Sequence, residues 1–155
     1  MPARLVQPGK RQRGLAMVEF AITLPVLLLL MAATAEFGHL IGQYDTLTKA
    51  VRDGARYAAS TAANGSTGLV SITPQIQAAV ANLVATGNAN GSGAALLPGL
   101  AATDIAVSDA GNGYVAVSAS YTYRPMVGAT LPTFGLGRPI SLSFTLNAAA
   151  VMRAL

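Results

Sequence analysis

The carboxylate of Glu19 lies where an apolar membrane helix would begin, directly before the charge-free run from Phe20 to Ala35. Placing a charge in the bilayer costs about 2.5–3.5 kcal/mol on insertion scales, so Glu19 needs either the membrane boundary or a cation beside it. Cleavage after Gly14 would supply that cation, because the new ammonium of Leu15 would lie four residues before Glu19 on a helix. Opposite charges attract at this spacing, and acidic groups are favoured near a helix N-terminus.

The same ion pair can join two neighbouring chains. An ammonium and a carboxylate 4 Å apart attract each other by about 4 kcal/mol at an effective dielectric of about 20. This attraction offsets part of the cost of burying both charges, whereas an unpaired buried charge is not tolerated. Glu19 is therefore predicted to set the register of helices that pack side by side. A plain residue at the membrane boundary is the alternative.

The sequence lacks the side-chain combinations of common catalytic sites. His39 is the single histidine, and cysteine is absent. His39 follows the apolar run, where we expect interfacial packing rather than catalysis. Asp104 and Asp109 flank a predicted strand beside turn residues, so we interpret them as turn and edge residues, with a metal-binding carboxylate pair as the other interpretation. We predict no catalytic, cofactor-binding or metal site, and no enzyme.

Glu19 would be carried by a membrane helix over residues 15–42, which is long enough to cross about 30 Å of hydrocarbon. Four of the ten basic residues precede it, and no acidic residue does. The positive-inside rule then keeps the N-terminus in the cytoplasm and places the remainder outside. A cleaved secretory signal is the alternative. Beyond Gly14, six basic and six acidic residues cancel, so we expect no nucleic-acid partner.

The helical pattern continues beyond the membrane as an amphipathic stem, residues 43–62, so that Leu15 to Ser60 form one rod about 70 Å long. Beyond Glu36, the predicted apolar face of the rod consists of Phe37, Leu40, Ile41, Tyr44, Leu47, Val51 and Ala55. Pro25 lies inside the rod and is expected to kink or loosen it.

Small residues recur at every fourth position of the rod: Thr34, Gly38, Gly42, Thr46, Ala50, Gly54 and Ala58. Each glycine inside a helix costs about 1 kcal/mol relative to alanine, and such a row allows two helices to approach closely. We therefore predict helix packing along this row. The alternative is coincidence in a chain rich in alanine and glycine.

Residues 63–155 are predicted to form a small α+β domain. Thr73, Pro74 and Gly87 are the cap, first turn and stop of a short helix. Strand patterns follow at residues 104–109, 114–123 and 140–152, and the sequence AGNG joins the first two as a tight hairpin. The predicted fold class is thus α+β: a long N-terminal helix, a short helix and a small antiparallel sheet.

Residues 13 to about 59 contain, in order, "RG", "VEF", "LP", "EFG" and "AxRxGAR". In this order and spacing they resemble the TadE-like family, the minor pilins or pseudopilins of the tight adherence (Tad/Flp) type IV pilus. Asp53 is a mild departure, since the family often has glutamate there. The resemblance implies a leader, residues 1–14, that prepilin peptidase removes between Gly14 and Leu15, with Glu19 as the matching fifth-position glutamate.

The family also implies residence in the bacterial inner membrane, with the C-terminal domain outside, and a role in assembling or initiating the pilus. The expected partners are membrane lipid, prepilin peptidase, other pilins or pseudopilins, and the proteins of the assembly platform. The alternative function is a single-pass anchor that displays an adhesion or ligand-binding domain outside any filament. Tyr121 and Tyr123 could form such a binding surface, and core packing is the other interpretation of both.

Overall fold

The computed structural model describes residues 12–63, 70–131, 133 and 137–154. Residues 1–11, most of the expected leader, and residues 64–68, the "NGSTG" segment predicted to end the rod, lie outside this part of the chain. The described elements are two α-helices, a short 3₁₀ helix and five strands. They confirm the predicted α+β class, with a long apolar N-terminal helix, a short helix and a small antiparallel sheet.

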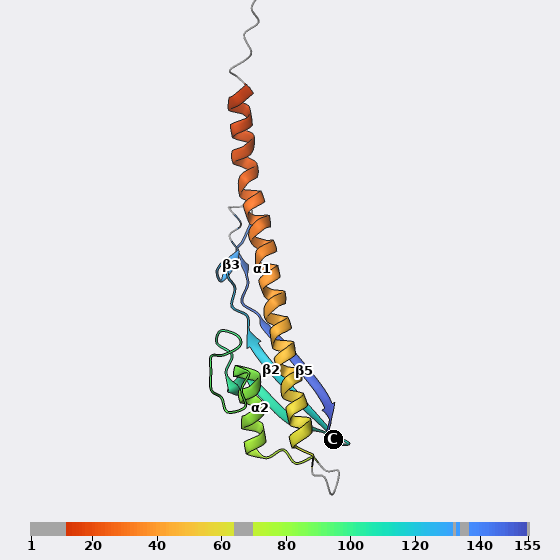
Figure 1. The fold of residues 1–155 in the computed structure, drawn as a ribbon. Helices are drawn as coiled ribbons and strands as arrows, with labels where there is room; N and C mark the ends of the chain where they lie inside the picture. The colour runs from red at the N-terminus through yellow and green to blue at the C-terminus, as the bar shows by residue number, and fades with distance from the viewer. Residues whose placement is uncertain (1–11, 64–69, 132, 134–136, 155) are drawn as a thin grey trace, which may run out of the picture.

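Helix α1, Gln12–Thr61, is 50 residues long and extends about 75 Å at 1.5 Å per residue. It stays continuous through Pro25 (Figure 1), so the proline does not divide the predicted rod into two helices. On its surface, Lys49 Nζ donates to Asp45 Oδ2 at 2.6 Å, which is the i, i+4 ion pair expected from the spacing.

Helix α2, Pro74–Thr86, has the ends that its sequence predicts. The Thr73 hydroxyl accepts a hydrogen bond from the backbone N–H of Ile76 at 3.3 Å. Pro74 occupies the first turn, where a missing N–H costs nothing. Gly87 ends the helix in the left-handed conformation, with φ of 77°, and its N–H bonds to the Leu83 carbonyl.

The main sheet is antiparallel and has the order β1-β2-β5. Strands β1, Ile105–Gly111, and β2, Tyr114–Thr122, are joined by a two-residue turn at Asn112 and Gly113, both with positive φ. That conformation suits asparagine and glycine and confirms the predicted hairpin. A 3₁₀ helix, Ala102–Asp104, precedes β1.

The predicted strand over residues 140–152 is divided between two sheets, and its prediction as one element was wrong. Its beginning is β4, Ile140–Ser141, which pairs with β3, Thr130–Leu131, in a separate two-stranded sheet. Its end is β5, Thr145–Arg153, which pairs with β2. The backbone changes partner in between: the Leu142 N–H bonds to Ala129, and the Phe144 carbonyl accepts from Tyr123. The alternation of apolar and polar residues cannot reveal such a change of partner, because the alternation continues unchanged through the point where the partner changes.

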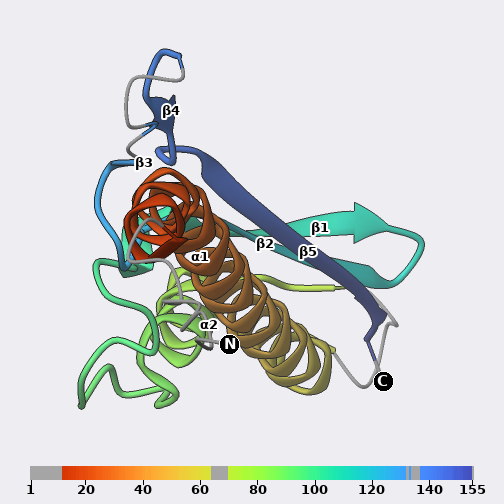
Figure 2. The same ribbon diagram turned by 90° about the horizontal axis from the view of Figure 1, so that it is seen from above.

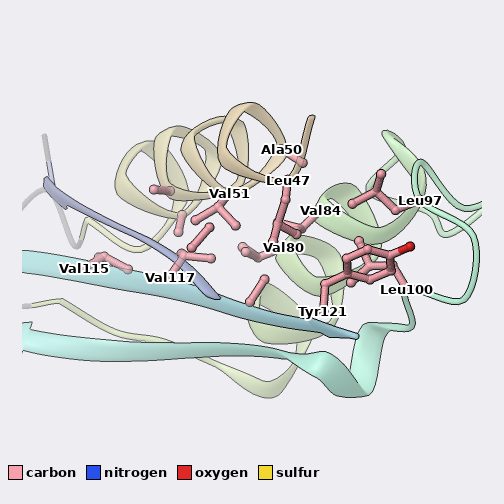
Figure 3. Packing of buried hydrophobic residues seen from close by; sticks show 14 of the residues in the cluster. Leu47, Ala50, Val51, Val80, Val84, Leu97, Leu100, Val115, Val117 and Tyr121 are labelled. Carbon is pink, nitrogen blue, oxygen red and sulfur yellow. The ribbon is translucent and has the colours of Figure 1, made fainter. Parts of the chain in front are cut away.

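The hydrophobic core lies between the C-terminal half of α1, helix α2 and one face of the main sheet (Figure 3). Its largest fully buried side chains are Leu47, Val51, Val80, Val84, Val115, Val117 and Tyr121. In Figure 2, helix α2 lies to one side of the rod, and the β3–β4 pair lies apart from α2, near the N-terminal part of α1. The core thus holds the second half of the rod against the domain.

The predicted apolar face of the stem is confirmed only in its C-terminal part. Leu47, Val51 and Ala55 are buried. Phe37, Ile41 and Tyr44 of the same predicted face are exposed by 62%, 53% and 48%. The domain covers a side of α1 that includes the polar residues Glu36 and Gln43 instead.

Candidate functional site

Gly14, Leu15 and Glu19 lie in the first turns of α1, and all three are exposed. Leu15 is 74% exposed. Among the side chains that the structure describes, none forms an ion pair with the exposed Glu19 carboxylate. The geometry brings Leu15 and Glu19 within one helical turn of each other, on the same side of α1.

The helix surface beyond Glu19 is apolar and uncovered. By length and composition, α1 is able to cross a membrane, and its most apolar 18-residue window has no buried residue. Pro25 lies in this stretch and is half-buried. The exposed side chains include Phe20, Ile22, Val26, Leu27, Leu28, Leu30 and Met31. A helix of a soluble core would bury such side chains, so this half of α1 needs an apolar surrounding from outside the chain.

The small-residue row divides into two parts with different surroundings. Gly38 and Gly42 are exposed, and a Cβ at either would meet no atom within 4 Å. Ala50, Gly54 and Ala58 are buried inside the chain's own core. A Cβ at Gly54 would overlap the Val84 side chain of α2, and it would lie 3.4 Å from Val80. The close helix approach at Gly54 is thus an approach of α1 to α2.

A buried carboxylate, Glu36, joins α1 to the segment that follows β2. Glu36 is 4% exposed. Its oxygens accept hydrogen bonds from the backbone N–H of Met126 at 3.1 Å, from that of Val127 at 3.0 Å, and from the Tyr123 hydroxyl. We call these four residues the Glu36 cluster. The described donors satisfy both carboxylate oxygens, as a buried charge requires.

The Tyr123 hydroxyl also donates to the Glu36 backbone carbonyl at 3.2 Å. Burial, together with the neighbouring carboxylate, raises the pKa of the Tyr123 phenol, so the phenol stays protonated and remains a donor. The Tyr123 ring stacks on Phe144 with a centroid distance of 5.0 Å, and His39 lies beside it at 6.1 Å. His39 therefore has the packing role expected from its position.

Two turns beyond Glu36 on α1, Gln43 makes a second contact with the same segment. Its side chain is 5% exposed and donates to the Arg124 carbonyl at 3.3 Å. The Gln43 amide nitrogen also lies 2.7 Å from His39 Nε2. Glu36 and Gln43 thus hold residues 123–127 along two turns of α1.

The remaining residues with candidate chemistry have local structural partners. Asp104 accepts from the Ala101 N–H at 2.9 Å, and Asp109 accepts from the Gly111 N–H at 2.8 Å. Tyr121 and Tyr123 are each 2% exposed, so they belong to the interior, not to a binding surface. In the described ranges, no group of three or more His, Cys, Asp or Glu residues is placed to hold a metal ion.

The sequence pattern did not predict the Glu36 cluster, although it contains Glu36 in the "EFG" motif. A usable signal was present: Glu36 is a second carboxylate, directly after the charge-free run that ends at Ala35. Its partners are about 90 positions later in the chain, and two of them are backbone N–H groups that any residue provides.

A family model described as TadE-like protein matches residues 14–56. This match confirms the resemblance predicted from the sequence, and it covers the exposed half of α1, Glu36 and the buried glycine of the stem. Searches of curated proteins and of solved structures gave no match.

Proposed function

We propose that the chain is a non-catalytic, pilin-like subunit that takes part in assembling or initiating a tight adherence type IV pilus. The observation that carries this proposal is the agreement between family match and architecture. Residues 14–56 match the TadE-like family and form a helix that is bare and apolar in its first half and packed on a small domain in its second. A bare apolar half can be surrounded first by lipid and then by the helices of other subunits.

Prepilin peptidase removes residues 1–14 in this mechanism and leaves Leu15 with a free ammonium. Glu19 then pairs with an ammonium, either its own or that of a neighbouring chain. The exposure of both residues supports the pairing between chains, because no described residue of the same chain covers them. The pairing fixes the register in which the apolar halves pack.

The membrane-spanning part ends near Ala35, seven residues before the boundary expected from the sequence. Twenty-one residues from Leu15 to Ala35 extend about 31 Å, which matches the thickness of the hydrocarbon layer. The next residue, Glu36, is buried by the domain and not by lipid. The domain therefore begins directly at the outer surface of the bilayer.

The test replaces Glu19 with alanine in cells that make the pilus. We expect unchanged protein level and loss of pilus assembly, because the register pair is gone. Val18→Ala, a truncation of a neighbouring exposed side chain, is the matched control and should leave piliation intact. Normal piliation of Glu19→Ala would remove Glu19 from the mechanism and favour a simple membrane anchor, which needs no such pair.

A further inference from the structure

Exposed apolar side chains lie in β4, in the segments just before β3 and just after β4, and on α1 where it meets the second of these segments. Phe37 of α1, Met126 and Val127 of the segment after β2, Ile140 of β4, and Phe144 are exposed by 62%, 63%, 44%, 58% and 39%. We call these five residues the hairpin surface. A group of apolar side chains of this size on one part of a small domain indicates an interaction surface.

The hairpin surface lies on the end of the domain that is nearest to the apolar half of α1. The Arg124 carbonyl is held at Gln43, whereas the Met126 and Val127 amides are held at Glu36. The segment therefore runs back along α1, toward its N-terminus, as it leaves β2. Figure 1 shows β3 continuing in this direction beside the orange part of α1.

This position fits a membrane surface when it is combined with the proposed boundary near Ala35. Phe37 is two residues beyond that boundary, which is about 3 Å along the helix. Phenylalanine, methionine and isoleucine at such a level can enter the interfacial region, where burial of apolar area drives binding. A hollow of about 160 Å³ adds to this surface; its lining includes Ala33 and Phe37 of α1 and Leu142 and Phe144.

The positive charge of the C-terminal third is suited to binding an anionic membrane surface. After Asp109 the sequence has no acidic residue and has three arginines, Arg124, Arg138 and Arg153. Arg138 is exposed and lies two residues before β4. Arginine beside apolar interfacial residues can reach the lipid phosphates, and a basic residue near an anionic membrane strengthens binding to it.

We propose that the hairpin surface rests in the outer interface of the lipid bilayer, with Arg138 at the level of the phosphate groups. The inference depends on the proposed function in one respect, since it needs α1 to span the membrane. It adds a second membrane contact, so that the domain is fixed in orientation relative to the bilayer and does not rotate freely on its helix. The Glu36 cluster makes this orientation rigid.

The chain contains no tryptophan, so single tryptophans report depth directly. The full-length protein is placed in vesicles of phosphatidylethanolamine and phosphatidylglycerol that carry bromine on the acyl chains, either close to the carbonyl or near the chain end. Three variants are compared: Ile140→Trp in the hairpin surface, Tyr114→Trp at the far turn of the sheet, and Leu27→Trp in the middle of the proposed span. All three positions are exposed, so the substitutions leave the core unchanged.

We expect Leu27→Trp to be quenched most by bromine near the chain end. Ile140→Trp should be quenched by bromine near the carbonyl at least about twofold more than Tyr114→Trp, as an interfacial position requires. Adding Arg138→Gln should weaken the Ile140→Trp quenching in phosphatidylglycerol vesicles toward its value in vesicles of phosphatidylcholine.

The other outcomes separate the two proposals. If Leu27→Trp is not quenched, α1 is not inserted and the proposed function fails together with this inference. If Leu27→Trp is quenched and Ile140→Trp behaves like Tyr114→Trp, the anchor stands and the inference is overturned. Ile140→Trp could also be shielded from water without being quenched by bromine, and the shielding could increase as protein density rises. In that case a second copy covers the hairpin surface, lipid does not, and the inference is overturned.

Discussion

Two glutamates of one helix have opposite surroundings, and this difference assigns them different roles. Glu36 is enclosed by hydrogen-bond donors of its own chain, whereas Glu19 is exposed, and no described residue is placed to pair with it. A carboxylate with internal donors stabilises its own fold, and one without them is available to another chain. We therefore expect substitutions of Glu36 to change stability and substitutions of Glu19 to change assembly.

Glu36→Gln should lower the free energy of unfolding by about 1–3 kcal/mol. The amide group that replaces one oxygen cannot accept a hydrogen bond, so the cluster loses either the bond from the Val127 N–H to Oε2 or the bond from the Tyr123 hydroxyl to Oε1. The backbone amides of Met126 and Val127 also lose the negative charge of their acceptor. Thermal unfolding in detergent and hydrogen exchange at these two amides measure the effect. Asp45→Asn, which removes an exposed ion pair on the same helix, should change stability by less than about 1 kcal/mol. Equal effects of the two substitutions would contradict the role of Glu36.

Tyr123→Phe tests the same cluster by removing a hydrogen-bond donor, whereas Glu36→Gln changes the acceptor. The ring can still stack on Phe144, so the loss is confined to the hydroxyl hydrogen bonds to Glu36. We expect a loss of stability of about 1–3 kcal/mol, because the acceptor is charged. In a double-mutant cycle with Glu36→Gln, the two losses should not add. Strict additivity would show that the two side chains act independently.

At the scale of elements, α1 uses one row of small residues in two ways. Its buried part lets α2 approach at Gly54, and its exposed part, Gly38 and Gly42, has no neighbour in the chain. The exposed glycines are thus the part of the row that remains open for a helix of another subunit.

Gly54→Ala should destabilise the domain by about 1–3 kcal/mol, although alanine favours a helix. The new methyl group would overlap Val84, which is fully buried and has little room to move. The second substitution Val84→Ala should recover part of the loss, since it removes the overlapping atoms. Unfolding curves of the single and double variants measure the change in the free energy of unfolding. A Gly54→Ala variant that is more stable than the original protein would contradict this prediction and show that α2 can shift away from α1.

Gly38→Ala and Gly42→Ala should behave differently, because a methyl group at either position meets nothing. Each should keep stability or raise it by up to about 1 kcal/mol. If these glycines contact a neighbouring helix in the pilus, piliation should fall despite the stable subunit. Piliation at the normal level in both variants would assign the exposed part of the row to coincidence.

The elements that could be predicted from the sequence are those with local causes. The Thr73 cap, the Gly87 stop and the turn at Asn112 and Gly113 depend on residues within a few positions of one another. The covered side of α1 and the division between β4 and β5 depend on contacts between distant segments. Glu36 belongs to the second kind, so its role required the fold.

For the molecule as a whole, we propose that the membrane boundary lies near Ala35. A charge in the middle of the span, Leu27→Lys, should reduce membrane integration, at a cost of about 2.5–3.5 kcal/mol. Ile41→Lys, an equally exposed apolar position beyond the boundary, should leave integration unchanged. Resistance of each variant to alkaline extraction measures integration. Equal loss for both variants would extend the span to residue 42, as the sequence alone indicated.

The central claim is that the chain is a processed, pilin-like subunit. The most direct measurement is the intact mass and N-terminal sequence of the protein from membranes of cells with and without their prepilin peptidase. We predict a start at Leu15 in the presence of the peptidase and an uncut N-terminus without it. A start at Met1 or Pro2 in both strains would contradict processing, and the chain would then be a membrane-anchored domain with no free ammonium at Leu15 for Glu19 to pair with.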